Sequence, residues 1–397
     1  MDDDALRQWL ALSLLPGLTP TGLNTLWQHA GSGKGWLQLD AAALSSHGLS
    51  RKQCAQVGAI LQGRLPAALA REAERALAWA AQPGNYLLPL YDAAYPALLR
   101  EIPDPPPLLY VRGHPAVLDL PQLALVGSRK PSADGRRAAR AIAAELCTAG
   151  YHITSGLALG IDTASHQGAL DRNGVTVAVL GSGLRQLYPM QNRALAEAIV
   201  ERGALVSEFP LDTPPLPACF PQRNRVISGL AHGVLVVEAA LRSGSLITAR
   251  LAAEQGREVF AIPGSIHNPV AAGCHQLLRQ GATLVAGVDD LFEELPGLLG
   301  WERQRLAGIA RAAGGVVENI VENTENTDAE GEVVRALAPE ARRILDEIAW
   351  QPLSIDVLAL HTRLPVPQLY THLTTLELAG LILREGGGYV RGPGKLC

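Results

Sequence analysis

The segment 125–132 reads Leu125-Val126-Gly127-Ser128-Arg129-Lys130-Pro131-Ser132, an apolar run that passes through a small Gly/Ser turn into a helical pattern at 135–149. Turns of the same kind follow at 155–162, 181–183 and 243–245. Such a turn places unpaired backbone N–H groups at the positive end of a helix, which is the chemistry of an anion site. Several of these turns on one sheet edge predict a phosphate-binding surface rather than a single nucleotide pocket.

Short apolar runs alternate with helical patterns from residue 122 to about residue 295. Strands are expected at 122–126, 151–154, 175–180, 204–207, 234–237, 258–262 and 283–285. Near-continuous apolar strands that alternate with helices predict an α/β fold with a doubly wound parallel sheet. Ligands of such sheets bind at the carboxyl ends of the strands, which is where the Gly/Ser turns fall.

Composition limits the class of protein. A chain of 397 residues suggests two to four domains, and 48% hydrophobic residues can bury a sizeable core. The net charge of -4 argues against bulk polyelectrolyte binding, so any affinity for nucleic acid has to come from a local patch. Five scattered cysteines without a Cys-x-x-Cys pair fit reduced, cytoplasmic thiols and give no zinc framework. No signal peptide, membrane span, metal or nucleotide cofactor is expected.

The N-terminal residues 1–82 are expected to form short helices punctuated by Gly and Pro. The segment 14–22 reads as a tight hairpin between two helical patterns, as in a helix-hairpin-helix or SAM-like domain. Such a hairpin binds the DNA backbone. Thr19, however, stands where a second glycine is usual, so a small helical packing domain is the alternative. Residues 83–121 are proline-rich, so we expect an irregular lead-in to a domain spanning 83–310.

The C-terminal part is expected to be a separate unit. Residues 311–338 are acidic and lack aromatic residues, which predicts a flexible linker. Residues 339–397 contain three helical patterns and a hairpin at 381–391, the order of a winged helix. The third helix of a DNA-reading winged helix needs cationic or amide side chains. The pattern at 366–379 has no Lys or Arg and carries Glu377, which favours protein docking or a structural role.

A second basic constellation lies at a loop-to-helix junction, where Phe220-Pro221-Gln222-Arg223-Asn224-Arg225 follows a proline-rich loop. Guanidinium groups bind phosphates bidentately, and an aromatic ring can stack on an unpaired base. The residues themselves leave two interpretations open, a nucleic-acid site or a surface salt-bridge cluster with Phe220 as a core plug.

The order of motifs resembles the DNA-processing protein A (Dpr/Smf) family of bacterial recombination mediators. The resemblance covers residues 86–290 densely. It rests on Gly127-Ser128-Arg129-x-x-Ser132, Ser155-Gly156-Leu157-Ala158-x-Gly160-Ile161-Asp162, Gly181-Ser182-Gly183 with Tyr188-Pro189, Phe220-Pro221-x-Arg223-Asn224-Arg225, Ser243-Gly244-Ser245-Leu246-Ile247-Thr248 and Pro263-Gly264-Ser265.

This resemblance implies an extended Rossmann-like domain that binds single-stranded DNA, forms a homodimer and loads the RecA recombinase onto strands coated by single-strand-binding protein in natural transformation. It implies no catalytic activity. The site residues carried over by motif are Gly127, Ser128, Arg129 and Ser132 as a phosphate pocket, Arg223, Asn224 and Arg225 beside it, Ser182, Gly183, Ser243, Gly244 and Ser245 at the same rim, and Phe220 as a base-stacking residue. Replacing Arg129 or Arg223 by Ala is expected to weaken strand binding without lowering the melting temperature.

Two other functions compete with this interpretation. A Rossmann-type hydrolase of the lysine-decarboxylase-like phosphoribohydrolase class would carry Pro-Gly-Gly-x-Gly-Thr, whereas the comparable segment here, 238–245, lacks it. A scaffold with a vestigial anion site is the third possibility. Asp162 and His166 lie one helical turn apart, but an N-cap and a packed histidine are favoured over a catalytic pair. Glu238 is expected to be either a rim acceptor or a structural anchor.

Overall fold

The computed structural model describes residues 3–31, 34–39, 44, 49–295 and scattered positions between 341 and 391. The chain divides into two compact units, residues 1–312 and 313–397, which are considered separately. The predicted linker at 311–338 and most of the predicted helices of 339–397 lie outside the described residues. Among the described helices, none combines the length and the apolar character that crossing a membrane requires.

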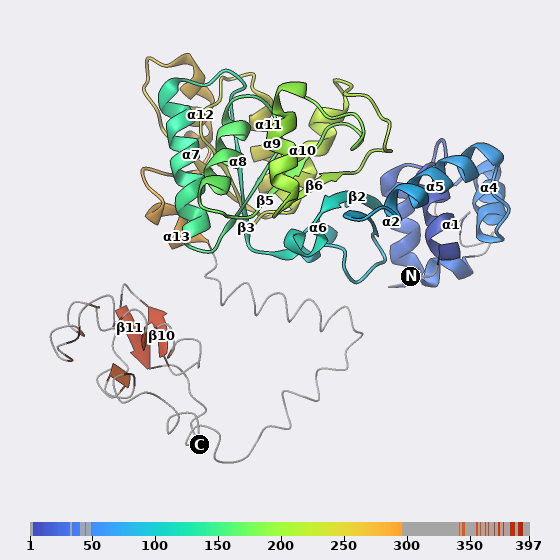
Figure 1. The fold of residues 1–397 in the computed structure, drawn as a ribbon, viewed down its shortest axis with the longest axis horizontal. Coiled ribbons are helices and arrows are strands. Elements are labelled where there is room, and N and C mark those ends of the chain that lie inside the picture. Colours follow the sequence, from blue (N-terminus) through green and yellow to red (C-terminus); the bar gives the residue numbers. More distant parts are fainter. Residues whose placement is uncertain are drawn as a thin grey trace, which may run out of the picture. The chain divides into compact units, whose positions relative to one another are not determined.

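A nine-stranded sheet forms the centre of the first unit (Figure 1). The strands lie in the order β1-β2-β6-β5-β4-β3-β7-β8-β9. Their bounds are β1 Asn85–Pro89, β2 Leu108–Gly113, β3 Gln122–Val126, β4 His152–Ser155, β5 Thr176–Val179, β6 Ala204–Ser207, β7 Gly233–Val236, β8 Glu258–Ala261 and β9 Thr283–Leu284. Every pair from β6 to β9 in this order is parallel, so the predicted doubly wound sheet is confirmed.

Helices cover both faces of this sheet (Figure 1). Alternate residues of a strand point to opposite faces. Accordingly, Leu123 and Leu125 of β3 join a buried cluster with α7 and α8, whereas Ala124 and Val126 join another with α9, α10 and α11. The helices are α6 Ala97–Arg100, α7 Ala133–Thr148, α8 Ile161–Asp171, α9 Arg193–Val200, α10 Cys219–Gly229, α11 Gly244–Glu254, α12 Ala272–Arg279 and α13 Asp289–Glu294, with 3-10 turns η2 Pro115–Asp119, η3 Met190–Asn192 and η4 Pro269–Ala271.

The expectation of an irregular lead-in over 83–121 is wrong. Within this segment, β1 and β2 pair antiparallel with each other, and β2 pairs antiparallel with β6. The prolines do not prevent this pairing because Pro89 is the last residue of β1 and the run 105–107 ends just before β2. The sheet is therefore mixed at this edge and parallel elsewhere.

The N-terminal helices pack directly onto that edge. They are α1 Asp3–Ser13, α2 Pro20–His29, α4 Arg51–Leu61 and α5 Ala67–Ala80, with the 3-10 turn η1 Gly35–Gln38. Trp9 of α1 is fully buried, and its ring centre lies 4.9 Å from that of Trp36 and 5.1 Å from that of Tyr91. The buried cluster that begins at these aromatic residues continues without a break into the sheet. The helical module and the sheet therefore share one core.

In the second unit, the predicted hairpin is confirmed. β10 Ile382–Glu385 pairs antiparallel with β11 Gly388–Arg391. Ile344 and Leu345 of this unit are buried in a cluster with Leu369, Leu373, Leu376, Ile382 and Tyr389.

Candidate nucleic-acid interface

The turns that follow β3 and β7 line a cleft at the carboxyl edge of the sheet. β3 lies between β4 and β7, so strand order reverses at this point, and ligands of open α/β sheets bind at such a switch point. The cleft has a volume of about 860 Å³ and is lined by residues of the segments 126–130, 215–227 and 240–248. These include the Gly/Ser turns at 127–128 and 243–245 and, from the second basic constellation, Phe220, Arg223 and Asn224. The fold thus brings together motifs that are far apart in the sequence.

Three cationic side chains of this cleft, those of Arg129, Lys130 and Arg242, are exposed. Within the part of the chain that the structure describes, none of them forms an ion pair. Asp162 is the only acid among the described lining residues, and it is buried. The cleft therefore presents uncompensated positive charge to solvent, which attracts an anionic ligand.

Two aromatic rings form one side of the cleft. The ring centre of Phe220 lies 5.4 Å from the guanidinium carbon of Arg129 and 5.8 Å from the ring centre of Tyr188. Phe220 is half-buried and Tyr188 is 46% exposed. A cation over an aromatic face is attracted by the ring quadrupole, so Arg129 is oriented by Phe220. Solvent-accessible rings beside a cationic groove are suited to stacking on unpaired bases.

The turn after β7 contributes the N-terminus of α11. Ser243 is the N-cap, and its Oγ accepts a hydrogen bond from the backbone N–H of Ser245 at 3.3 Å. Gly244 is exposed, and an added Cβ would meet no atom within 4 Å. Residues 243–245 thus lie at the cleft together with Gly127 and Ser128, as their motifs predict, and the end of α11 is open to a ligand.

Ser132 is not a lining residue, because its polar groups are used inside the protein. It is the N-cap of α7, where its Oγ accepts from the backbone N–H of Gly135 at 2.9 Å. Its hydroxyl and its backbone N–H donate to the carboxylate of Glu238, at 2.5 and 2.8 Å. Asn268 also donates to that carboxylate, at 3.2 Å. Of the two expected roles of Glu238, a rim acceptor or a structural anchor, these contacts fit the structural anchor. Its carboxylate is the anion at the N-terminus of α7.

Arg223 lines the cleft but is only 5% exposed. Its Nη1 donates to the backbone oxygen of Gly156 at 2.8 Å and also to that of Val179. A Cβ at position 156 would lie 2.7 Å from the guanidinium nitrogens, so glycine is what makes room for this contact. Burial lowers the pKa of Arg223 to about 10, against the opposing effect of Asp162. The guanidinium therefore ties together the ends of two strands.

Asn224 is buried beside Arg223 and also lines the cleft. Its Oδ1 accepts from Arg223 Nε at 3.3 Å, and its Nδ2 donates to the backbone oxygen of Gly244 at 3.3 Å. Asn224 therefore connects α10 to the turn that begins α11.

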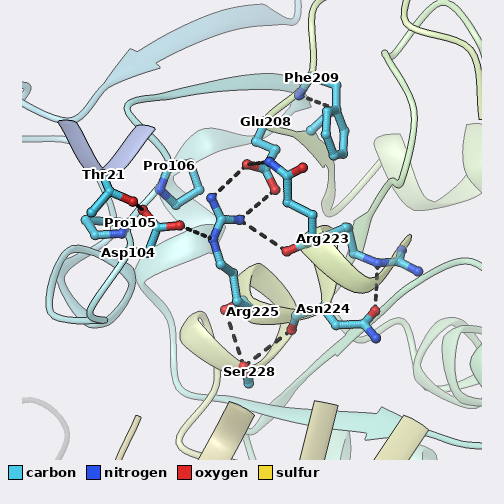
Figure 2. Close-up of polar contacts among 12 residues, drawn as sticks. Thr21, Asp104, Pro105, Pro106, Glu208, Phe209, Arg223, Asn224, Arg225 and Ser228 are labelled. Carbon is cyan, nitrogen blue, oxygen red and sulfur yellow. Dashed lines mark hydrogen bonds and ion pairs between the residues drawn. The ribbon is translucent and has the colours of Figure 1, made fainter. Parts of the chain in front are cut away.

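Arg225 points away from the cleft. Its guanidinium forms a bidentate ion pair with Glu208, at 2.6 and 2.8 Å, and donates to Asp104 at 3.2 Å (Figure 2). Ser182 and Gly183 are likewise absent from the lining. The Ser182 hydroxyl donates to the backbone oxygen of Gln186 at 2.6 Å, and the Gly183 N–H donates to that of Thr213 at 2.9 Å. These three residues hold loops around the cleft.

Asp162 and His166 are both engaged in local structure. Gly160, not Asp162, is the N-cap of α8, so the N-cap expectation is wrong. The Asp162 carboxylate instead accepts from the N–H groups of Gly156 and Ala158, at 3.1 and 3.2 Å, while burial raises its pKa. His166 Nδ1 lies 2.7 Å from Thr176 Oγ1, and burial lowers its pKa to about 3.

Lys130, Tyr188 and Arg242 line the cleft but are absent from the predicted set of site residues. Lys130 is adjacent to Arg129, so charge alone could have indicated it. Arg242 directly precedes the Ser243 turn, and Tyr188 precedes Pro189 in one of the quoted motifs. Lys130 and Arg242 share the signal of a cationic residue within or next to a Gly/Ser turn.

Comparisons with known proteins show the family and the fold. Residues 86–296 match the family model described as DNA recombination-mediator protein A, and residues 329–388 match the DprA winged helix domain. Protein Smf of Escherichia coli (strain K12) is 43% identical over 354 residues, which cover 89% of this chain and 87% of that protein. The DNA processing protein DprA of Streptococcus pneumoniae is 45% identical over 205 residues, 52% of this chain and 72% of that protein. The X-ray structure of DNA processing protein A from Streptococcus pneumoniae is similar with a TM-score of 0.63 at 35% identity, covering 72% of this chain and 96% of that chain.

Proposed function

This chain belongs to the family of DNA recombination-mediator protein A, and from this premise we propose that its cleft binds single-stranded DNA for recombination. The observation that carries the proposal is the juxtaposition of unpaired cations with the exposed ring of Tyr188 and the half-buried ring of Phe220 in one cleft. Arg129, Lys130 and Arg242 would contact phosphates, and Phe220 and Tyr188 would stack on bases. In a duplex the bases are already stacked inside the helix, so this combination favours a single strand.

The Gly/Ser turns would supplement the cations. The backbone at Gly127 and Ser128 and the open N-terminus of α11 at 243–245 offer N–H groups to phosphate oxygens. We assign Ser132, Ser182, Gly183 and Arg225 to the support of these loops rather than to the strand. Arg223 and Asn224 would hold the floor of the cleft and touch the strand at most through their exposed edges.

The later steps of the proposal rest on the family resemblance. A homodimer of this chain would protect the bound strand during natural transformation. It would then load the RecA recombinase onto strands that are coated by single-strand-binding protein. The mediator would act by binding and would catalyse no covalent step. The winged helix, with its charge-poor third helical pattern, would dock a protein rather than read DNA.

The proposal is tested by fluorescence anisotropy with a labelled oligothymidine and, in parallel, a hairpin duplex of equal length. We expect tight binding of the single strand, weaker binding of the duplex and a steep loss of affinity with salt. Turnover of a nucleoside monophosphate is measured on the same preparation. Absence of strand binding at low salt, together with release of a base from the monophosphate, would replace the proposal with the hydrolase alternative.

A further inference from the structure

The ion pair of Arg225 joins the cleft helix to a distant segment of the chain. Arg225 lies on α10, the helix that also carries Phe220 and Arg223. Its fork bonds Glu208, which directly follows β6, and its Nε donates to Asp104 at 3.2 Å (Figure 2). The side chains of Arg225 and Glu208 are only 9% and 4% exposed. A bidentate pair of this kind fixes orientation as well as distance.

Asp104 begins the proline run that the N-terminal helices hold. The Thr21 hydroxyl of α2 donates to the Asp104 carboxylate at 3.2 Å (Figure 2). Asn24 of the same helix donates to the backbone oxygen of Pro105 at 2.7 Å, and the Trp9 indole of α1 donates to that of Pro107 at 2.7 Å. Successive groups of this segment are therefore bound by the helical module on one side and, at Asp104, by Arg225 on the other.

Four of the five N–H donors of Arg225 are used inside the protein, which leaves one N–H on Nη2. Its Nε and both Nη atoms bond carboxylates, and Nη1 also bonds the backbone oxygen of Gln222 at 3.2 Å. Burial opposes the charge, but Glu208 and Asp104 together more than offset it and raise the pKa of the guanidinium. The guanidinium of Arg225 therefore stays charged and remains paired with Glu208 and Asp104.

We infer that Arg225 is a positioning residue which couples the seating of the N-terminal helices to strand binding in the cleft. The inference rests on the proposed function. Arg225 fixes α10 against Glu208 and Asp104, and α10 in turn places Phe220 under Arg129. The N-terminal helices then strengthen strand binding without touching the strand. Because coupling is reciprocal, a bound strand also tightens the contact between α1–α2 and the segment 104–107.

The direction in which Glu208→Gln changes the affinity for oligothymidine distinguishes this role from a direct phosphate contact. Glu208→Gln removes a negative charge and releases Arg225 from its bidentate partner. If Arg225 met phosphate, the variant would bind oligothymidine more tightly. A positioning role predicts the opposite, a loss of about fivefold or more, in the usual range of coupling between sites. Arg225→Lys keeps the charge but loses the fork, and the same loss is expected.

The matched control is Asp171→Asn. Asp171 forms a bidentate pair with Arg140 between α7 and α8, at 2.5 and 2.8 Å, and neither residue lines the cleft. This substitution should leave the affinity for oligothymidine unchanged. Affinity is measured at a temperature at which circular dichroism shows that each variant is folded.

A second measurement on the wild-type chain keeps the inference testable if Glu208→Gln does not fold. Oligothymidine should slow hydrogen exchange in α1 and α2, and Arg225→Lys should abolish that protection. A wild-type chain that does not bind oligothymidine overturns the proposed function and this inference together. A wild-type chain that binds, with unchanged exchange in α1 and α2 or with tighter binding by Glu208→Gln, overturns the inference alone.

Discussion

Ser132 donates its hydroxyl and its backbone N–H to the two carboxylate oxygens of Glu238. The positive end of α7 is thereby occupied by an anion that belongs to the protein. We therefore expect the turn after β3 to contact phosphate through Arg129 and Lys130, which precede Ser132 in the chain and are exposed. By contrast, the N-terminus of α11 at residues 243–245 lines the cleft.

Ser132→Ala should therefore act on stability more than on strand binding. The substitution removes the N-cap of α7 and one of the hydrogen bonds to Glu238. Its expected cost is about 1–3 kcal/mol in the free energy of unfolding, measured by urea denaturation. A variant with unchanged stability and a tenfold weaker affinity for oligothymidine would place a phosphate on Ser132 instead.

Tyr188→Ala and Phe220→Ala should each weaken strand binding by about 1–3 kcal/mol, the usual contribution of stacking on one base. Stacking releases no counterions, so the slope of log affinity against log salt should stay at the wild-type value. Tyr86→Ala is the control, because Tyr86 is 41% exposed on β1 and does not line the cleft. If all three variants bound the strand with the wild-type affinity, neither ring of the cleft would contribute to binding.

Arg223→Ala should lower both stability and affinity, in contrast to the expectation of an unchanged melting temperature. The substitution leaves the buried backbone oxygens of Gly156 and Val179 without this donor. We expect a loss of about 2–4 kcal/mol in the free energy of unfolding. Calorimetry measures this loss. A melting temperature equal to that of the wild type would show that these carbonyl contacts contribute nothing.

Acid should destabilise the protein through His166. Burial, with a smaller effect of Arg223, lowers the pKa of His166 to about 3, below the unfolded value of about 6.5. The unfolded state therefore binds the proton first. Stability is fully present above pH 6.5 and falls by about 1.4 kcal/mol per pH unit as the pH drops toward the folded value. His166→Gln should reduce that slope by the same amount, and parallel curves for variant and wild type would contradict the assignment.

The buried strands could be predicted from the sequence almost to the residue. β3 at Gln122–Val126 and β6 at Ala204–Ser207 coincide with the predicted strands, because continuous apolar runs bounded by turn residues have few other uses. β1 and β2 were missed, since their pairing with each other and with β6 is a non-local property that neighbouring prolines obscure.

The candidate site was predicted as a set of turns but not as a set of contacts. The Gly/Ser turns at 127–128 and 243–245 line the cleft at the carboxyl edge of the sheet, whereas the turn at 181–183 does not. The separation of Arg129, which is exposed, from Arg225, which is paired, could not be predicted from residue types. It depends on Glu208 and Asp104, whose positions beside α10 are set by the fold.

The central claim is that an unpaired Arg129 binds a phosphate of single-stranded DNA. It is tested most directly by titrating labelled oligothymidine with the wild type, Arg129→Ala and the control Arg250→Ala across a salt series. Arg250 is exposed on α11 and does not line the cleft. We predict that Arg129→Ala loses about 1.5–3 kcal/mol of binding free energy and that its salt slope falls by about 0.7, with no change in melting temperature. An affinity and a slope equal to those of Arg250→Ala would contradict the account.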